Sequence, residues 1–169
     1  MSQYLLNEAS FDLPEVLKDR TVHQFVINDK GPNEFTFVIS RAEDITQTSL
    51  LEFVNYLEIQ LRKTLPKFQL REKRQHLLPN AVSLELNYTW KNGNDWMHQR
   101  QVAVLVHGPD QNAKALLFTG TCVKEFTPHW NLVYEDMLNS LKLSAPYIPN
   151  SIPNSIPNSS PTSPQVAEE

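Results

Sequence analysis

The sequence predicts a soluble α/β domain in which two main helices flank a twisted antiparallel sheet. Three observations support this prediction. Apolar residues alternate along several stretches, two capped amphipathic stretches predict helices, and short turn-forming segments join consecutive strands. A chain of 169 residues is long enough for one such domain with a sizeable core.

The first part of the chain predicts short strands followed by a β-hairpin. Residues 4–13 indicate one or two short strands that end at Pro14. Residues 21–27 and 34–41 alternate as two longer strands, and the segment 28–32 between them is rich in turn-forming residues. We therefore expect these two strands to pair directly as a hairpin.

Two stretches carry the start and stop signals of helices. Ser49 and Glu52 have the spacing of a capping box, and an apolar stripe of helical period continues until Pro66. Near the end of the chain, Thr127 is a suitable N-cap and Pro128 suits the first helical position. The sequence therefore predicts one helix near 50–65 and a second from 128 onward.

Between the helices, four alternating stretches predict an antiparallel meander, namely 68–78, 81–90, 96–107 and 114–123. The charges in the first stretch suit an edge strand. The last two stretches are apolar on both sides in their later halves, which is typical of central strands covered on both faces. Together with the hairpin they predict a single twisted sheet.

The composition changes sharply at residue 146. The segment 146–169 repeats Ile-Pro-Asn-Ser, and its frequent prolines remove backbone donors and block helix formation. We expect a disordered Pro/Asn/Ser-rich tail after a folded domain of residues 1–145. The tail is interpreted as a tolerated repeat expansion, with a ligand for a proline-binding partner as the alternative.

Charge and composition disfavour several classes of function. The formal net charge of −4 argues against a nucleic-acid-binding protein, which normally has a basic face. The N-terminal residues lack the features of a secretion signal, and no apolar run approaches the length of a membrane span. We therefore expect a cytoplasmic protein that does not itself insert into the membrane.

The residues that carry catalysis or bind cofactors show no recognisable motif. The five histidines lack the spacing of metal ligands, and the isolated glycines cannot form a phosphate-binding loop. Cys122 and His98 are candidates for a small hydrolase, but no nucleophile–base motif accompanies them, so a buried structural thiol is the favoured interpretation. We expect a protein without metal or cofactor that is not an enzyme.

The predicted hairpin has one face that is unusual for protein surface. Phe35, Phe37 and Ile39 form a core face on the second strand. The opposite faces carry no charge and consist of Val22, Gln24, Val26, Thr36, Val38 and Ser40. Either a helix of this domain or a second subunit covers this face, or the face is a groove for a foreign apolar helix, to which Gln101 adds an amide.

The sequence resembles the Eag chaperones of bacterial type VI secretion, within the broader DcrB-like group. The resemblance extends over roughly residues 1–143. It is carried by Tyr4, Leu6, Glu8-Ala9, Leu13-Pro14, Phe37-Val38-Ile39-Ser40-Arg41, Leu65-Pro66-Lys67-Phe68, Tyr88-Thr89-Trp90 and Arg100-Gln101-Val102. The resemblance implies a PsbP-like α/β sandwich that works as a homodimer.

The resemblance also implies a function. Such a chaperone would hold the N-terminal transmembrane helices and pre-PAAR segment of a PAAR-domain or Rhs-type effector in the cytoplasm before the effector is loaded onto the secretion spike. The implied binding positions are Val22, Gln24, Thr36, Val38, Ser40 and Gln101. Gln24 departs from the family pattern, which is apolar there. The alternative is a DcrB-like or PsbP-like accessory protein of another envelope or secretion complex.

Overall fold

The structure is a computed structural model that describes residues 2–6, 8–14, 16–17, 20–31, 33–42, 49–107 and 113–144. The predicted tail 146–169 lies outside these residues. The elements, in chain order, are β1 (Ser2–Leu5), β2 (Ser10–Leu13), β3 (His23–Val26), β4 (Phe35–Ala42), α1 (Leu50–Thr64), β5 (Gln69–Leu78), β6 (Ala81–Asn92), β7 (Asp95–His107), β8 (Ala113–Cys122) and α2 (Pro128–Asn139). This order confirms the predicted succession of strands and helices.

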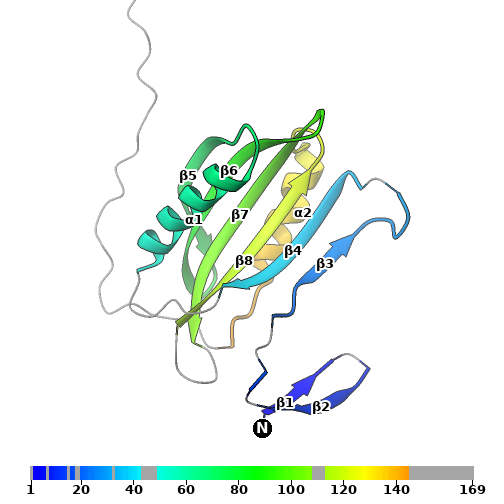
Figure 1. The fold of residues 1–169 in the computed structure, drawn as a ribbon, viewed down its shortest axis with the longest axis vertical. Coiled ribbons are helices and arrows are strands. Elements are labelled where there is room, and N and C mark those ends of the chain that lie inside the picture. Colours follow the sequence, from blue (N-terminus) through cyan, green and yellow to red (C-terminus); the bar gives the residue numbers. More distant parts are fainter. Residues whose placement is uncertain are drawn as a thin grey trace, which may run out of the picture.

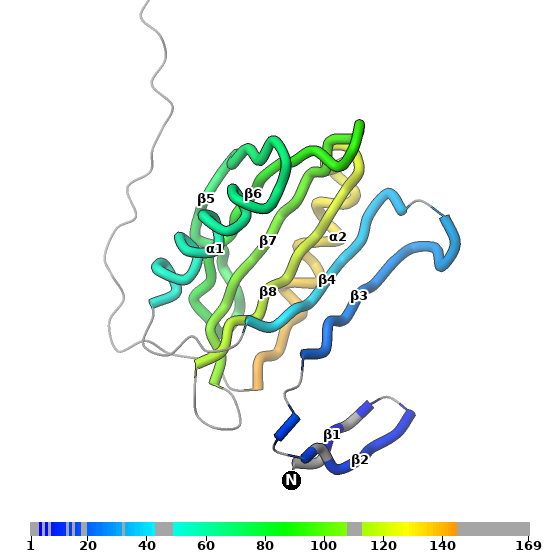
Figure 2. Tube along the Cα trace, viewed as in Figure 1, coloured from blue at the N-terminus to red at the C-terminus, as the bar shows by residue number. Residues whose placement is uncertain are grey.

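The main sheet has six strands in the order β3-β4-β8-β7-β6-β5, and every neighbouring pair is antiparallel (Figure 1). The predicted central strands β7 and β8 lie in the middle, and the charged strand β5 forms one edge. Strands β1 and β2 pair only with each other, as a small hairpin that Figure 2 shows apart from the main sheet. The mixed α/β class predicted from the sequence is confirmed.

Helix α1 begins and ends where the sequence predicts. The Ser49 side chain accepts a hydrogen bond from the backbone of Glu52, whose carboxylate accepts one from the Ser49 backbone, so the capping box is complete. Leu65 ends the helix just before Pro66. The apolar stripe packs on one face of the sheet, in a core that consists of Phe53, Val54, Leu84, Leu86, Tyr88, Ala103, Leu105, Ala115 and Leu117.

Helix α2 packs on the opposite face of the sheet. Thr127 caps its N-terminus, and its side chain accepts a hydrogen bond from the Trp130 backbone. This second core consists of Phe35, Phe37, Val102, Val104, Phe118, Cys122, Tyr134 and Leu138. The expectation that Phe35 and Phe37 face a core is therefore confirmed.

The two helices cover different halves of the sheet. Figure 1 shows α1 in front of the β5–β6 side and α2 behind β8 and β4. The core under α1 reaches Ala115 and Leu117 of β8, with Ala42 of β4 packed against it, and no helix among the described residues packs on the remaining positions of β8 and β4 or on β3 on this side of the sheet. This part of the sheet, together with the adjoining Gln99 and Gln101 of β7, is called the open face, and it carries the predicted binding residues.

Candidate functional site

The strand register brings the predicted binding residues together on the open face. Gln24 of β3 lies opposite Val38 of β4, Val38 lies opposite Thr119 of β8, and Thr119 lies opposite Gln101 of β7. These four side chains form one row across four strands. The predicted positions on β3, β4 and β7 thus share a face, although β8 separates β4 from β7.

Two further rows flank this one. Thr36 belongs to the row Val26–Thr36–Thr121–Gln99, and Ser40 lies opposite Leu117 in a third row. Val22 directly precedes β3, where alternation assigns it to the same side, and its side chain is exposed. None of the residues in these three rows on β3, β4, β8 and β7 is ionisable, so the open face is neutral across four strands.

Strand β8 adds site residues that reasoning from the sequence missed. Gln101 donates a hydrogen bond to Thr119 at 2.9 Å, and Gln99 donates one to Thr121 at 2.8 Å. Gln99 also accepts a hydrogen bond from the Trp90 indole at 2.8 Å. The alternation of β8 indicates which of its side chains share a face, but only the strand order shows that this face is continuous with the hairpin.

The Gln101 amide is only partly satisfied. Its side chain is buried, yet the carbonyl oxygen Oε1 has no hydrogen-bond partner. A buried acceptor without a partner is unfavourable, so native structures usually satisfy such groups. A donor on a molecule that lies against the open face would supply the missing bond.

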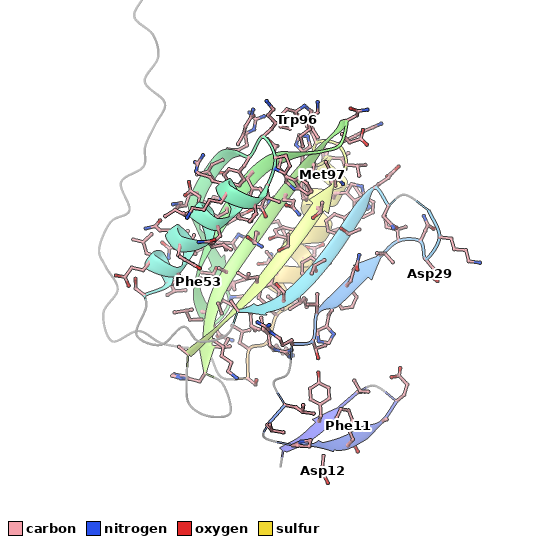
Figure 3. The ribbon with its side chains drawn as sticks, viewed as in Figure 1. Phe11, Asp12, Asp29, Phe53, Trp96 and Met97 are labelled. Atoms are coloured by element: carbon pink, nitrogen blue, oxygen red, sulfur yellow. The ribbon has the colours of Figure 1, made fainter. Side chains whose placement is uncertain are left out.

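Helix α1 forms one border of the open face. Lys73 of β5 bonds Asn55 at 2.8 Å and Glu58 at 2.6 Å, which ties one flank of α1 to the sheet edge. At 100° per residue, the opposite flank carries Phe53, Leu57, Gln60 and Thr64. This flank, which includes the buried Phe53 labelled in Figure 3, borders the open face and was not predicted as part of the site.

The candidate nucleophile is in an unfavourable environment for catalysis. Cys122 is buried, and its burial, together with the charge of Glu34, raises the pKa of the thiol to about 11. The register places His98 directly opposite Cys122, but no hydrogen bond joins the two side chains. An activated cysteine requires a lowered pKa and a bonded base. The arrangement therefore supports the structural interpretation of this thiol.

The opposite face holds an ionic cluster that was not predicted. Glu85 of β6 is 1% exposed, and it accepts hydrogen bonds from Arg100 at 2.6 Å and from Arg74 at 2.9 Å. His76 Nδ1 lies 3.2 Å from the same carboxylate, and Arg100 also bonds Glu135 of α2. The cluster therefore joins three strands to α2.

The environment of this cluster keeps Glu85 ionised. Its burial favours the neutral acid, but the hydrogen bonds from His76 and Arg100 and the nearby guanidinium charges outweigh this effect and lower the pKa of Glu85 to about 2. Arg100 also lies over the Tyr134 ring, 4.6 Å from its centroid. Because Arg100 and Glu85 are paired within the fold, we interpret them as structural residues.

The described residues contain no group of three or more His, Cys, Asp or Glu side chains placed to hold a metal ion. None of the helices that the structure describes is both long and apolar enough to cross a membrane. The open face offers aliphatic surface together with hydroxyl and amide groups. Its chemistry suits non-covalent binding of an elongated, largely apolar partner.

Comparison with known proteins identifies the class. The family model of DcrB matches residues 8–140, so the chain belongs to the DcrB family. This agrees with the resemblance noted in the sequence. The chain is also similar to Effector EagT6 of Pseudomonas aeruginosa, with 29% identity over 146 residues that cover 83% of this chain and 95% of that protein.

Solved structures show the same fold. The crystal structure of PA94, a Pseudomonas aeruginosa protein of unknown function, matches with a TM-score of 0.69 and 23% identity, covering 90% of this chain and 99% of that chain. LpqN of Mycobacterium tuberculosis, involved in cell envelope biogenesis, matches with a TM-score of 0.51 and 13% identity, covering 76% and 85%. At these identities the comparisons establish the architecture alone.

Proposed function

We propose that this protein is a cytoplasmic chaperone that binds and shields the N-terminal transmembrane helices and pre-PAAR segment of a type VI secretion effector before it is loaded onto the secretion spike. The observation that carries the proposal is the open face, which is neutral across four strands and on whose β3 and β4 positions Gln24, Val26, Thr36 and Val38 no helix among the described residues packs. The resemblance to Eag chaperones and the similarity to Effector EagT6 support it.

The geometry of the open face suits a helix as its occupant. A transmembrane helix exposes apolar side chains all round and aggregates in water, so a carrier must bury much of its surface. Small side chains such as Thr36 and Ser40 allow a helix backbone to approach closely, as small residues do between membrane helices. The flank of α1 provides a wall along one side of such a helix.

The polar groups of the open face have a role in the same proposal. Polar side chains within transmembrane segments need hydrogen-bond partners when they leave water. Gln101 offers an unpaired carbonyl oxygen, and the exposed Gln24 offers an amide at the other end of the same row. Gln24 is therefore proposed to bond a polar group of the bound segment, in a position where the family pattern is apolar.

The proposal includes a homodimer and a defined partner. Two copies would each contribute one open face, so that a pair of helices could be shielded together. The partner is the N-terminal region of a PAAR-domain or Rhs-type effector. The measured mass of the purified protein in solution tests the dimer, since twice 19.5 kDa is expected and a value near 19.5 kDa would contradict it.

Co-expression with the effector N-terminal region tests the binding function. Full-length protein should keep that region soluble and elute with it as a complex. Val38→Asp, which places a charge in the centre of the open face, should abolish the complex while circular dichroism shows an unchanged fold. Leu132→Asp places the same charge on the exposed side of α2 and serves as the matched control.

Two results would contradict the proposal. One is an effector region that stays equally soluble without the chaperone and never co-elutes with it. The other is a Val38→Asp protein that retains full binding with a native fold. A Val38→Asp protein that unfolds would instead mean that this face is a structural surface of the domain.

A further inference from the structure

A polar cleft lies on the face of the sheet opposite the open face, beyond the N-terminus of α2. Its volume is about 430 Å³, and strands β5, β6 and β7 form its floor. The residues that matter for its chemistry are Arg71, Glu72, Asn87, Thr89, His98 and Glu125. The proposed function makes no use of this cleft.

An irregularity in β5 turns Arg71 toward the cleft. Successive side chains of a regular strand point to opposite faces, so Arg71 and Glu72 would not line the same cleft. The pairing of β5 with β6 shifts register between Leu70 and Glu72, and Arg71 is the extra residue at this bulge. Bulges commonly redirect a side chain next to a binding site, and here the redirected group is a guanidinium.

The floor of the cleft contains a buried hydroxyl without a partner. Thr89 is 2% exposed, and its Oγ1 makes no hydrogen bond. Thr89 lies directly opposite His98 in the pairing of β6 with β7. Buried hydroxyl groups are normally hydrogen-bonded. The unbonded Thr89 hydroxyl in the floor of the cleft therefore indicates that a ligand group binds there.

The charges around the cleft differ in how far they are already paired. Arg74 and Arg100 also line it, but both bond Glu85, and Arg100 bonds Glu135 as well. Arg71 takes part in no ion pair within the described ranges, and the exposed Glu125 lines the same cleft. Burial lowers the pKa of His98, and Glu125 and Arg71 shift it in opposite directions. Of the three arginines that line the cleft, Arg71 is therefore the one available to pair with an anionic ligand.

We propose that this cleft binds a carboxylate of an acidic peptide segment, with Arg71 forming the ion pair and the Thr89 hydroxyl and Asn87 amide donating hydrogen bonds. A guanidinium pairs with a carboxylate through two parallel N–H bonds, which suits a planar acid group. The cleft borders β5, an edge strand whose outer backbone groups are unpaired in the sheet. An extended peptide can lie along such an edge.

Titration of the full-length ¹⁵N-labelled protein with a short acidic peptide tests the site. The probe is acetyl-Gly-Asp-Glu-Gly-amide, and acetyl-Gly-Asn-Gln-Gly-amide is its uncharged counterpart. The acidic peptide should shift the amide signals of Thr89 and His98 and the Nε–H signal of Arg71 at low ionic strength. The uncharged peptide should leave these signals unchanged.

Variants identify the charge that is recognised. Arg71→Gln should weaken binding about tenfold, the loss expected for one charge-assisted contact. Glu125→Gln should strengthen it, because it removes a repelling carboxylate. Thr89→Val should weaken binding without unfolding the protein, and Lys30→Gln, in the exposed hairpin turn, should bind as the parent protein does.

Each contrary result would overturn the proposal. Equal binding of the two peptides would show that charge is not recognised. Unchanged binding of the acidic peptide by Arg71→Gln would show that Arg71 does not pair with its carboxylate. Displacement of the peptide by inorganic phosphate at lower concentration would make phosphate the ligand. Val38→Asp, which tests the open face, should bind the acidic peptide normally, so the two proposals can fail separately.

Discussion

Gln101 and Thr119 form a 2.9 Å hydrogen bond between β7 and β8 while the Gln101 carbonyl oxygen stays buried and unbonded. An apolar pair of similar shape would leave no unsatisfied group at this place. The unbonded carbonyl oxygen of Gln101 lowers the stability of the isolated fold. Buried groups without a hydrogen-bond partner are expected at positions that function requires.

The double variant Gln101→Leu/Thr119→Val is therefore expected to be as stable as the parent protein or up to about 1 kcal/mol more stable, because no buried amide remains unpaired. Urea unfolding measures this difference. The same variant should bind the effector segment less tightly, since the polar contacts of the open face are lost. A destabilisation above about 2 kcal/mol would show that this pair is a structural contact.

Removal of the buried charge at Glu85 should have the opposite effect on stability. Glu85→Gln leaves Arg74, His76 and Arg100 without their shared carboxylate, and loss of one partner of a buried ion pair costs about 3–5 kcal/mol. The retained bond from Arg100 to Glu135 moderates the loss. Urea unfolding of Glu85→Gln against Glu72→Gln, an exposed neighbour in the sheet, measures it, and equal stability of the two variants would contradict the prediction.

The low pKa of Glu85 predicts the direction of the pH dependence. The pKa is about 2 in the folded protein against a reference value of 4.5, so the folded state favours the ionised form. The resulting stabilisation is present in full above pH 4.5 and is lost as the pH falls toward 2. The free energy of unfolding should decline over this range, and Glu85→Gln should show a shallower decline. Identical slopes would exclude Glu85 as a source of acid sensitivity.

Gly120 is expected to tolerate no side chain. A Cβ atom at this position would lie 2.7 Å and 2.9 Å from two carbons of the Tyr134 ring, closer than real Cβ contacts. Tyr134 cannot easily move, because its ring is buried and its hydroxyl bonds the Phe118 carbonyl at 3.0 Å. Gly120→Ala should therefore destabilise the protein by about 1–3 kcal/mol in urea unfolding, whereas Thr121→Ser should change stability little.

Cys122 should be protected from thiol reagents in the native protein. Its side chain is buried and its pKa is raised to about 11, so little thiolate is present or accessible near neutral pH. Modification by iodoacetamide should be slow in native buffer and fast in urea, as followed by mass spectrometry. Rapid labelling of the native protein would mean that β8 opens readily.

Much of the fold could be predicted because the local signals agree with the final structure. The capping box of Ser49 and the N-cap of Thr127 lie where the helices begin, and the alternation of 81–90 continues through β6. The uncharged face of the hairpin can be predicted in the same way, because it follows from the local sequence. Alternation alone assigns Val38 and Phe37 to opposite sides of one strand.

The parts that could not be predicted depend on contacts between distant segments. The strand order places β8 between β4 and β7, and this order makes Thr119 and Thr121 part of the open face. Glu85 follows the pattern of a solvent-facing position, since a buried carboxylate cannot be distinguished from an exposed one until its partner Arg100 is known. The bulge at Arg71 leaves no local signal either, because it arises from the pairing of β5 with β6.

Strand β7 separates two chemical environments with a single backbone. His98 and Arg100 point toward the polar cleft, and Gln99 and Gln101, which alternate with them, point toward the open face. The two surfaces therefore share one stretch of backbone, because residues 98–101 contribute alternately to the cleft and to the open face.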